Sequence, residues 1–164
     1  MGRIWLIGMM GSGKTTIGAI VAERLQLPLL DTDGMVMERS GRTIPEIFDE
    51  SEQAFRALES GVVREAAEGP VAVISTGGGV VVDERNVEVM RRSGTTVLLD
   101  ASIDELVARI GRAGGRPLYQ SRESLVNLKA ERSELYAEAC DHIVDTNGRS
   151  IMDVAEEVIR CVRT

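Results

Sequence analysis

The sequence predicts one α/β domain in which helices cover both faces of a parallel sheet. Apolar runs of strand length alternate with stretches of helical spacing along the 164 residues, the pattern of successive β–α–β units. The runs 71–74 and 96–99 are apolar on both faces, as strands of a covered parallel sheet must be. A glycine-rich loop of phosphate-binding type joins the first strand to the first helix. We therefore expect an open α/β fold built to bind a phosphorylated ligand.

The expected strands are short and evenly distributed along the chain. They cover residues 3–7, 28–31, 71–75, 95–99 and 142–145. Helices are expected to fill the intervals, because strands that run in parallel need a crossover connection.

Local signals mark several helix ends. Residues 43–46 and 102–105 match the capping box, so a helix is expected to start at each. Gly94 follows the helical stretch 84–93, where a left-handed glycine often ends a helix. The last helix is expected to begin near Ser150. Tyr136 and His142 are expected to be packing residues, and Trp5 is expected to be an aromatic of the core or of the sheet surface.

Residues 111–123 break the helical pattern. The segment contains three glycines, a proline and several arginines without apolar periodicity, so little burial would hold it in place. We expect a cationic lid at about residues 112–122, between two helices.

The glycine-rich loop is the most informative motif. Residues 8–15 read G-x-x-x-x-G-K-T, the P-loop signature, between the strand at 3–7 and a helix at 15–25. Its glycines allow successive N–H groups to converge on a phosphate at the start of the helix. Lys14 can reach the β- and γ-phosphates, and the Thr15 hydroxyl can ligate Mg²⁺. The loop alone does not say where the phosphoryl group goes.

Three further clusters follow expected strands or carry charge. Asp31 and Asp33 can point at one site, as a metal-side carboxylate and an acceptor of a hydroxyl proton; a solvated turn with a helix cap is the alternative. The 75–79 run, S-T-G-G-G, allows close backbone approach or is only a tight turn. The third cluster is a set of arginines suited to carboxylates or phosphates, or to solvated surface: Arg56, Arg116 and Arg132.

Asp100 resembles the strand-terminal aspartate that holds Mg²⁺ in many P-loop proteins. It directly precedes the Ser102 cap, so we assign Asp100 to that helix start. Asp31 is then the expected metal-side carboxylate.

Composition limits the partners. The formal net charge of −7 argues against nucleic acid or an anionic membrane as the main partner. No apolar run approaches the ~20 residues that span a bilayer. The first expected strand starts at residue 3, so we expect no signal peptide and a cytoplasmic protein. Cys140 and Cys161 are expected to be reduced thiols.

In this order the motifs resemble those of the shikimate kinase family along essentially the whole chain. The marks are the P-loop, D-T-D at 31–33, F-R-x-x-E at 55–59, G-G-G at 77–79, R-P-L at 116–118 and R-x-x-L-Y at 132–136. Ser51 departs from the glycine usual in the family, which changes only a turn.

The resemblance implies a single P-loop NTPase domain over 1–164, like the nucleoside monophosphate kinases, with strand order 2-3-1-4-5 and a substrate-binding helical segment at about 33–61. It implies Mg²⁺-dependent transfer of the ATP γ-phosphoryl to the 3-hydroxyl of shikimate, in chorismate and aromatic amino acid biosynthesis, by a monomer.

The resemblance also implies residue roles. The expected catalytic residues are Asp33, Lys14 and Arg116. Those for ATP are Gly11, Ser12, Gly13, Lys14, Thr15, Thr16, Arg109, Arg116 and Arg149. Those for shikimate are Asp33, Arg56, Gly78, Gly79 and Arg132. Those for Mg²⁺ are Thr15 and, through water, Asp31.

Two alternatives compete with this interpretation. One is another small-metabolite P-loop kinase, such as a gluconate kinase, against which the paired aspartates, the glycine run and the arginine pair count. The other is a nucleotide-binding regulatory module without catalysis, although nothing in the sequence disables the site.

Overall fold

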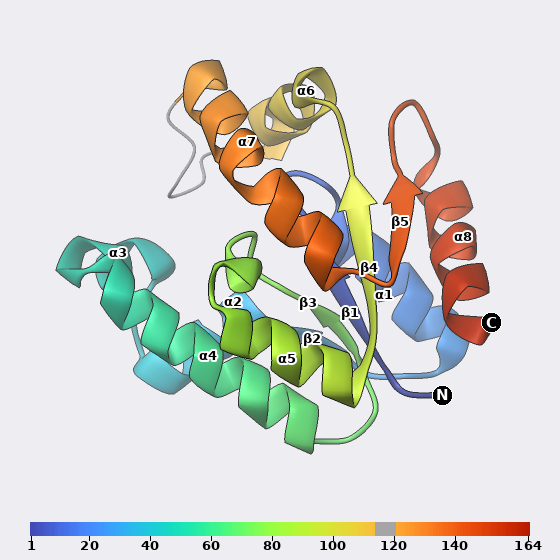
Figure 1. The fold of residues 1–164 in the computed structure, drawn as a ribbon, viewed down its shortest axis with the longest axis horizontal. Coiled ribbons are helices and arrows are strands. Elements are labelled where there is room, and N and C mark those ends of the chain that lie inside the picture. Colours follow the sequence, from blue (N-terminus) through green and yellow to red (C-terminus); the bar gives the residue numbers. More distant parts are fainter. Residues whose placement is uncertain (114–120) are drawn as a thin grey trace.

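The computed structural model describes residues 1–113 and 121–164 of the chain. Its centre is a five-stranded sheet in which every pair of neighbours is parallel, in the order β2-β3-β1-β4-β5 (Figure 1). The predicted fold class and strand order are confirmed. The strands are β1 (Arg3–Ile7), β2 (Leu29–Asp31), β3 (Val73–Ser75), β4 (Gly94–Asp100) and β5 (His142–Asp145).

Helices connect the strands and cover the sheet. They are α1 (Lys14–Leu25), α2 (Thr32–Ser40), α3 (Ile44–Glu50), α4 (Glu52–Glu68), α5 (Glu84–Ser93), α6 (Ile103–Ala113), α7 (Arg122–Ala139) and α8 (Ile151–Arg163), with a 3₁₀ turn at Val80–Val82. In the part of the chain that the structure describes, no helix combines the length and apolar character needed to cross a membrane.

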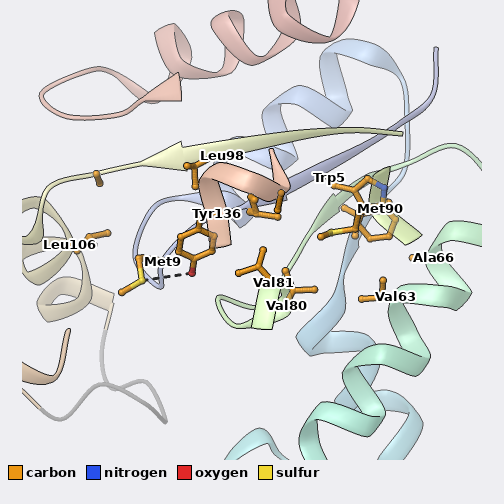
Figure 2. Packing of buried hydrophobic residues seen from close by; sticks show 14 of the residues in the cluster. Trp5, Met9, Val63, Ala66, Val80, Val81, Met90, Leu98, Leu106 and Tyr136 are labelled. Carbon is orange, nitrogen blue, oxygen red and sulfur yellow. Dashed lines mark hydrogen bonds between the residues drawn. The ribbon is translucent and has the colours of Figure 1, made fainter. Parts of the chain in front are cut away.

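The alternation of side chains along β1 divides the core in two. Trp5 and Ile7 enter a cluster with residues of α4, α5 and α7, whereas Ile4 and Leu6 pack with α1 and α8. All four are essentially inaccessible to solvent, as expected for successive residues of a strand covered on both faces. Figure 2 shows the first cluster, which extends from Trp5 and Met90 to Met9 and Tyr136.

A smaller cluster lies among α2, α3 and α4. Val36, Ile47, Phe55 and Val62 are buried together there, and the Phe48 and Phe55 rings stack with centroids 4.6 Å apart. Thr43 and Glu46 form the predicted capping box at the start of α3. These helices make up most of the segment 33–61, and the small cluster holds them together beside the main core.

Gly94 has a different role from the one predicted. It ends α5, but its φ of 177° is extended rather than left-handed. A Cβ at this position would overlap the carbonyl oxygen of Arg3. Glycine is therefore suited to the close approach of β4 to β1, where Arg3 and Gly94 are paired.

The predicted interruption at 111–123 is too long at both ends. Helix α6 continues to Ala113, and α7 begins at Arg122. Ser121 caps α7 together with Ser124, each side chain bonding the other residue's backbone N–H, a less common form of the capping box. Arg122 pairs with Asp104 of α6 at 2.6 Å. The remaining lid positions, among them Arg116, lie outside the described residues.

Candidate functional site

A cleft of about 1220 Å³ lies where the carboxyl ends of the strands meet, the usual ligand position in open α/β sheets. Of the residues expected to bind ligands, all that the structure describes line it. On the nucleotide side they are residues 11–16, Asp31, Arg109 and Arg149. On the acceptor side they are Asp33, Arg56, Gly78, Gly79 and Arg132.

The P-loop leaves β1 and turns directly into α1. Gly8, Gly11 and Gly13 all have positive φ, at 145°, 79° and 96°. A Cβ on Gly11 would lie 2.9 Å from the Ile110 side chain, so α6 packs closely on the loop. The loop is thus compact backbone at the N-terminus of a 12-residue helix, where amide groups and the helix dipole favour an anion.

Lys14 lies within the curve of this loop. Its Nζ donates to the carbonyl oxygens of Gly8 and Met9, at 2.7 and 2.9 Å. The residue is buried, with 8% of its surface exposed. These bonds hold the ammonium group against the backbone of the loop, at the wall of the cleft.

Oxygen atoms from three elements meet beside Thr15. Its Oγ1 donates to Asp31 Oδ2 at 3.2 Å and lies 3.2 Å from Ser75 Oγ. Asp31 Oδ1 also accepts from the backbone N–H groups of Asp33 and Gly34, so Asp31 caps α2 as well. Of the two alternatives that the sequence left open for Asp31, the helix cap is confirmed. The metal-side role stays a prediction, and the contact with Thr15 is compatible with it.

The sequence prediction gave Ser75 no role. The available signal was the parallel register: Ser75 pairs with Asp31 across β2 and β3, so both strands end on a polar side chain.

Two arginines line the wall of the cleft at the nucleotide end. Arg109 of α6 donates to the hydroxyl and carbonyl oxygens of Thr146, both at 3.1 Å. Arg149 donates to the carbonyl oxygen of Asp145 at 2.8 Å and pairs with Glu157 at 2.6 Å. These contacts fix both guanidinium groups on the cleft wall.

The acceptor side is built around the glycine turn that follows β3. A Cβ on Gly78 would meet Arg132 Nη1 at 3.4 Å, and one on Gly79 would overlap the Arg56 guanidinium. A Cβ on Gly77 would lie 2.8 Å from Asp33 Oδ1. Side chains from α2, α4 and α7 thus converge on bare backbone, with two guanidinium groups and the carboxylates of Asp33 and Glu59 around it.

The two guanidinium groups retain hydrogen-bonding capacity. Arg132 is 4% exposed, and its Nη1, like Nε of Arg56, is a buried atom without a hydrogen-bond partner among the described residues. Buried donors of this kind are uncommon. Their position in the cleft suits an anionic group of a ligand.

Tyr136 does more than pack, which is all that the sequence predicted. Its hydroxyl donates to the carbonyl oxygen of Gly78 and lies 3.7 Å from Met9 Sδ of the P-loop (Figure 2). Tyr136 is one helical turn from Arg132 on α7. One face of α7 therefore positions an arginine and ties the glycine turn to the P-loop.

Glu59 is the most unusual charged residue of the cleft. It is 1% exposed and pairs with Arg56 Nη1 at 2.9 Å. Burial raises its pKa to about 7, although the attraction of Arg56 opposes this rise. Glu59 belongs to the F-R-x-x-E motif, but no role was predicted for it, because a glutamate in a helical stretch gives no sign of its burial.

Asp100, which was predicted to act at the start of α6, has a charged partner in α7. Its carboxylate faces Lys129 at 3.5 Å. Ser102 caps α6 by accepting from the N–H of Glu105, and its own N–H donates to Asn147. The carboxylate beside Thr15 is that of Asp31.

Comparison with known proteins gives a consistent result. The family model for shikimate kinase matches residues 10–163. A shikimate kinase of Symbiobacterium thermophilum is 42% identical over 163 residues, covering 96% of this chain and 94% of the relative. One of Clostridium botulinum is 36% identical over 161 residues, covering 98% and 96%.

Solved structures agree. Shikimate kinase from Acinetobacter baumannii in complex with shikimate superposes with a TM-score of 0.95 at 33% identity, over 99% of this chain and 93% of that one. A gluconokinase from Sinorhizobium meliloti has a TM-score of 0.64 at 16% identity, over 99% and 91%. At that identity the likeness concerns the fold alone.

Proposed function

The chain belongs to the shikimate kinase family, and we propose that it transfers the γ-phosphoryl group of ATP to the 3-hydroxyl of shikimate, giving shikimate 3-phosphate and ADP. The observation that supports this most is the juxtaposition in one cleft of a P-loop and a carboxylate flanked by two arginines. The first suits a nucleotide, and the second suits a small hydroxy acid.

On the nucleotide side, the loop amides of residues 11–16 hold the phosphates at the N-terminus of α1. Lys14 moves from the loop carbonyls to the phosphates and neutralises charge that develops during transfer. Arg109 and Arg149, fixed on the cleft wall, offer flat cationic surfaces on which the adenine packs.

On the acceptor side, Arg56 and Arg132 bind the carboxylate of shikimate, because planar guanidinium groups match a carboxylate with paired hydrogen bonds. Gly78 and Gly79 have no side chains, so the ring of shikimate can lie directly against their backbone. Asp33 holds the hydroxyls and accepts the proton of the attacking one. The hydroxyl oxygen then forms the bond to phosphorus, and ADP leaves.

The oxygen donors beside the P-loop fit Mg²⁺, a hard cation that prefers such ligands and keeps several waters. Thr15 would hold it directly and Asp31 through water, with the hydroxyl of Ser75 in reach of Thr15. When bound, the ion neutralises phosphate charge.

Three expectations complete the proposal. Arg116, which lies outside the described residues, contributes a further cation to the phosphates. The enzyme acts as a monomer in the cytoplasm, and neither nucleic acid nor a membrane is a partner.

A coupled assay of ADP release tests the function. We expect Mg²⁺-dependent ADP release with shikimate, and no more than background with gluconate or without acceptor. Preference for gluconate would favour the alternative kinase, although the gluconokinase likeness rests on the fold. Nucleotide binding without turnover on any acceptor would favour the regulatory module.

A further inference from the structure

The surroundings of Glu59 contain more than an arginine. Its Oε1 pairs with Arg56, whereas its Oε2 is buried without a hydrogen-bond partner among the described residues. A Cβ on Gly77 would lie 3.0 Å from this Oε2 and 2.8 Å from Asp33 Oδ1. Two carboxylates therefore flank the same glycine, on the acceptor side of the cleft.

The charged and titratable groups that act on Glu59 come from three helices. They are Arg56 of its own helix, Asp33 of α2, and Arg132 and Tyr136 of α7. The two arginines favour the ionised carboxylate, whereas burial and Asp33 oppose it. Removal from water outweighs the attraction, so the pKa of Glu59 lies near neutrality.

A bound ligand with a carboxylate would change the balance of charge on the acceptor side of the cleft. In the cleft without ligands, two guanidinium groups face the two carboxylates of Asp33 and Glu59. A shikimate carboxylate bound by Arg56 and Arg132 adds a third negative charge to the same enclosed space. Three carboxylates against two guanidinium groups is unfavourable in a site of low dielectric constant. The carboxylate of Glu52 also pairs with Arg56, but it is largely exposed and therefore screened by solvent.

We propose that Glu59 is a proton-linked counterion of the acceptor site, which balances the arginines in the empty cleft and takes up a proton from solvent when the acceptor's carboxylate binds. Protonation removes one negative charge and leaves Arg56 for the ligand. Protonation also relieves the repulsion between Glu59 and Asp33, whose carboxylates flank the same glycine. Glu59 is thus a positioning residue that acts through Arg56.

The sign of the effect follows from linkage. Below the pKa of Glu59 the proton is already present, so the Kd for shikimate does not change with pH. Above about pH 7 the proton must be taken from solution, and the Kd rises by up to tenfold per pH unit. The carboxyl group of a free acid such as shikimate titrates below pH 5. The chain has one histidine, His142. It begins β5, the edge strand on the side of the sheet opposite β2, so it is not part of the acceptor site.

The inference rests on the proposed acceptor site and is tested without catalysis. Shikimate is titrated calorimetrically into the nucleotide-free protein between pH 5.5 and 9, in buffers of different ionisation enthalpy. At pH 7 we expect wild-type protein to take up as much as roughly half a proton per shikimate bound. Glu59→Gln, which is neutral at every pH, should bind without proton uptake and with a Kd independent of pH.

Glu52→Gln is the matched control. Glu52 also pairs with Arg56, at 3.3 Å, but its side chain is 66% exposed, so this variant should keep the proton uptake of the wild type. Binding by wild-type protein without proton uptake would overturn the inference and leave the proposed function intact. Uptake that persists in Glu59→Gln would also overturn it and assign the proton to Asp33. Absence of shikimate binding at any pH would instead refute the acceptor site.

Discussion

The nucleotide end and the acceptor end of the cleft are built from different materials. The nucleotide end is mainly one continuous stretch of backbone, residues 8–16, whose conformation is set by glycines and by packing against α6. The acceptor end is a set of charged side chains from α2, α4 and α7 that meet at a glycine turn. Backbone amides need no counter-charge, whereas grouped arginines and carboxylates must balance one another.

This difference decides where single substitutions act. A P-loop can lose one side chain and keep most of its phosphate-binding amides. On the acceptor side each charge also balances a neighbour, as Glu59 does for Arg56, so losing one alters the others. Variants at the acceptor end should therefore affect shikimate and leave ATP binding unchanged, while variants at the nucleotide end should act mainly on phosphoryl transfer.

The largest effect is expected for Asp33→Asn. The amide keeps the size of the side chain but cannot accept the hydroxyl proton, so kcat should fall by about 10²- to 10⁴-fold. Equilibrium binding of ATP should be unchanged. Asp31→Asn is the matched control, because asparagine caps α2 as well as aspartate does; it should mainly raise the Mg²⁺ concentration required. Identical Mg²⁺ dependence in both variants would refute this division of labour.

Lys14→Ala should lower kcat by about 10²-fold at saturating ATP, because the ammonium group is most useful when charge develops in the transition state. The loop amides remain, so nucleotide affinity should fall less than kcat. Lys129→Ala offers a control at the second lysine of the chain, whose partner is Asp100, and its kinetics should match the wild type. Near-normal turnover of Lys14→Ala would mean that the loop does not hold the transferring phosphate.

Arg56→Lys and Arg132→Lys should each raise the KM for shikimate by about tenfold or more, since a charged hydrogen bond contributes about 1.5–3 kcal/mol and lysine lacks the planar pair of donors. The KM for ATP should stay the same. The larger effect is expected at Arg132, which is the more buried of the two. Shikimate methyl ester should be a poor substrate of the wild type; equal activity on acid and ester would exclude carboxylate recognition.

The contrast also explains how far the sequence could be interpreted. The P-loop is contiguous, so its motif alone predicted the strand, the loop and the helix. Apolar runs located all five strands, but their order in the sheet came only from the family resemblance. The two arginines of the acceptor end and Asp33 lie far apart in the sequence, between residues 33 and 132. Their spacing alone could not distinguish a binding role from a position on the solvated surface.

Three of these misses, at Gly94, Tyr136 and Glu59, have a common physical cause, which is contact between segments distant in sequence. Gly94 looked like a helix-ending glycine because its closeness to Arg3 depends on strand pairing. The bond from Tyr136 to Gly78 spans 58 residues. The burial of Glu59 depends on packing that a single helical stretch does not reveal.

The smallest effects expected are those of two helix caps, one at each end of the cleft. Thr43 caps α3, which lines the acceptor end with Ile44 and Phe48, and Ser150 caps α8 beside Arg149 at the nucleotide end. Thr43→Ala and Ser150→Ala should each cost about 1 kcal/mol of stability, lowering the melting temperature by about 2–4 °C.

Because α3 is held by the small cluster around Ile47 and Phe55, loss of its cap should loosen the acceptor wall and raise the KM for shikimate, with the KM for ATP unchanged. Ser150→Ala, at the start of α8, should have the opposite effect: the KM for ATP should rise and the KM for shikimate should stay the same. Thermal melts and steady-state kinetics of both variants separate these outcomes. If each substitution raised both KM values, the two ends of the cleft would be structurally coupled. The contrast between an end built from backbone and an end built from charged side chains would then not extend to the helices α3 and α8 beside them.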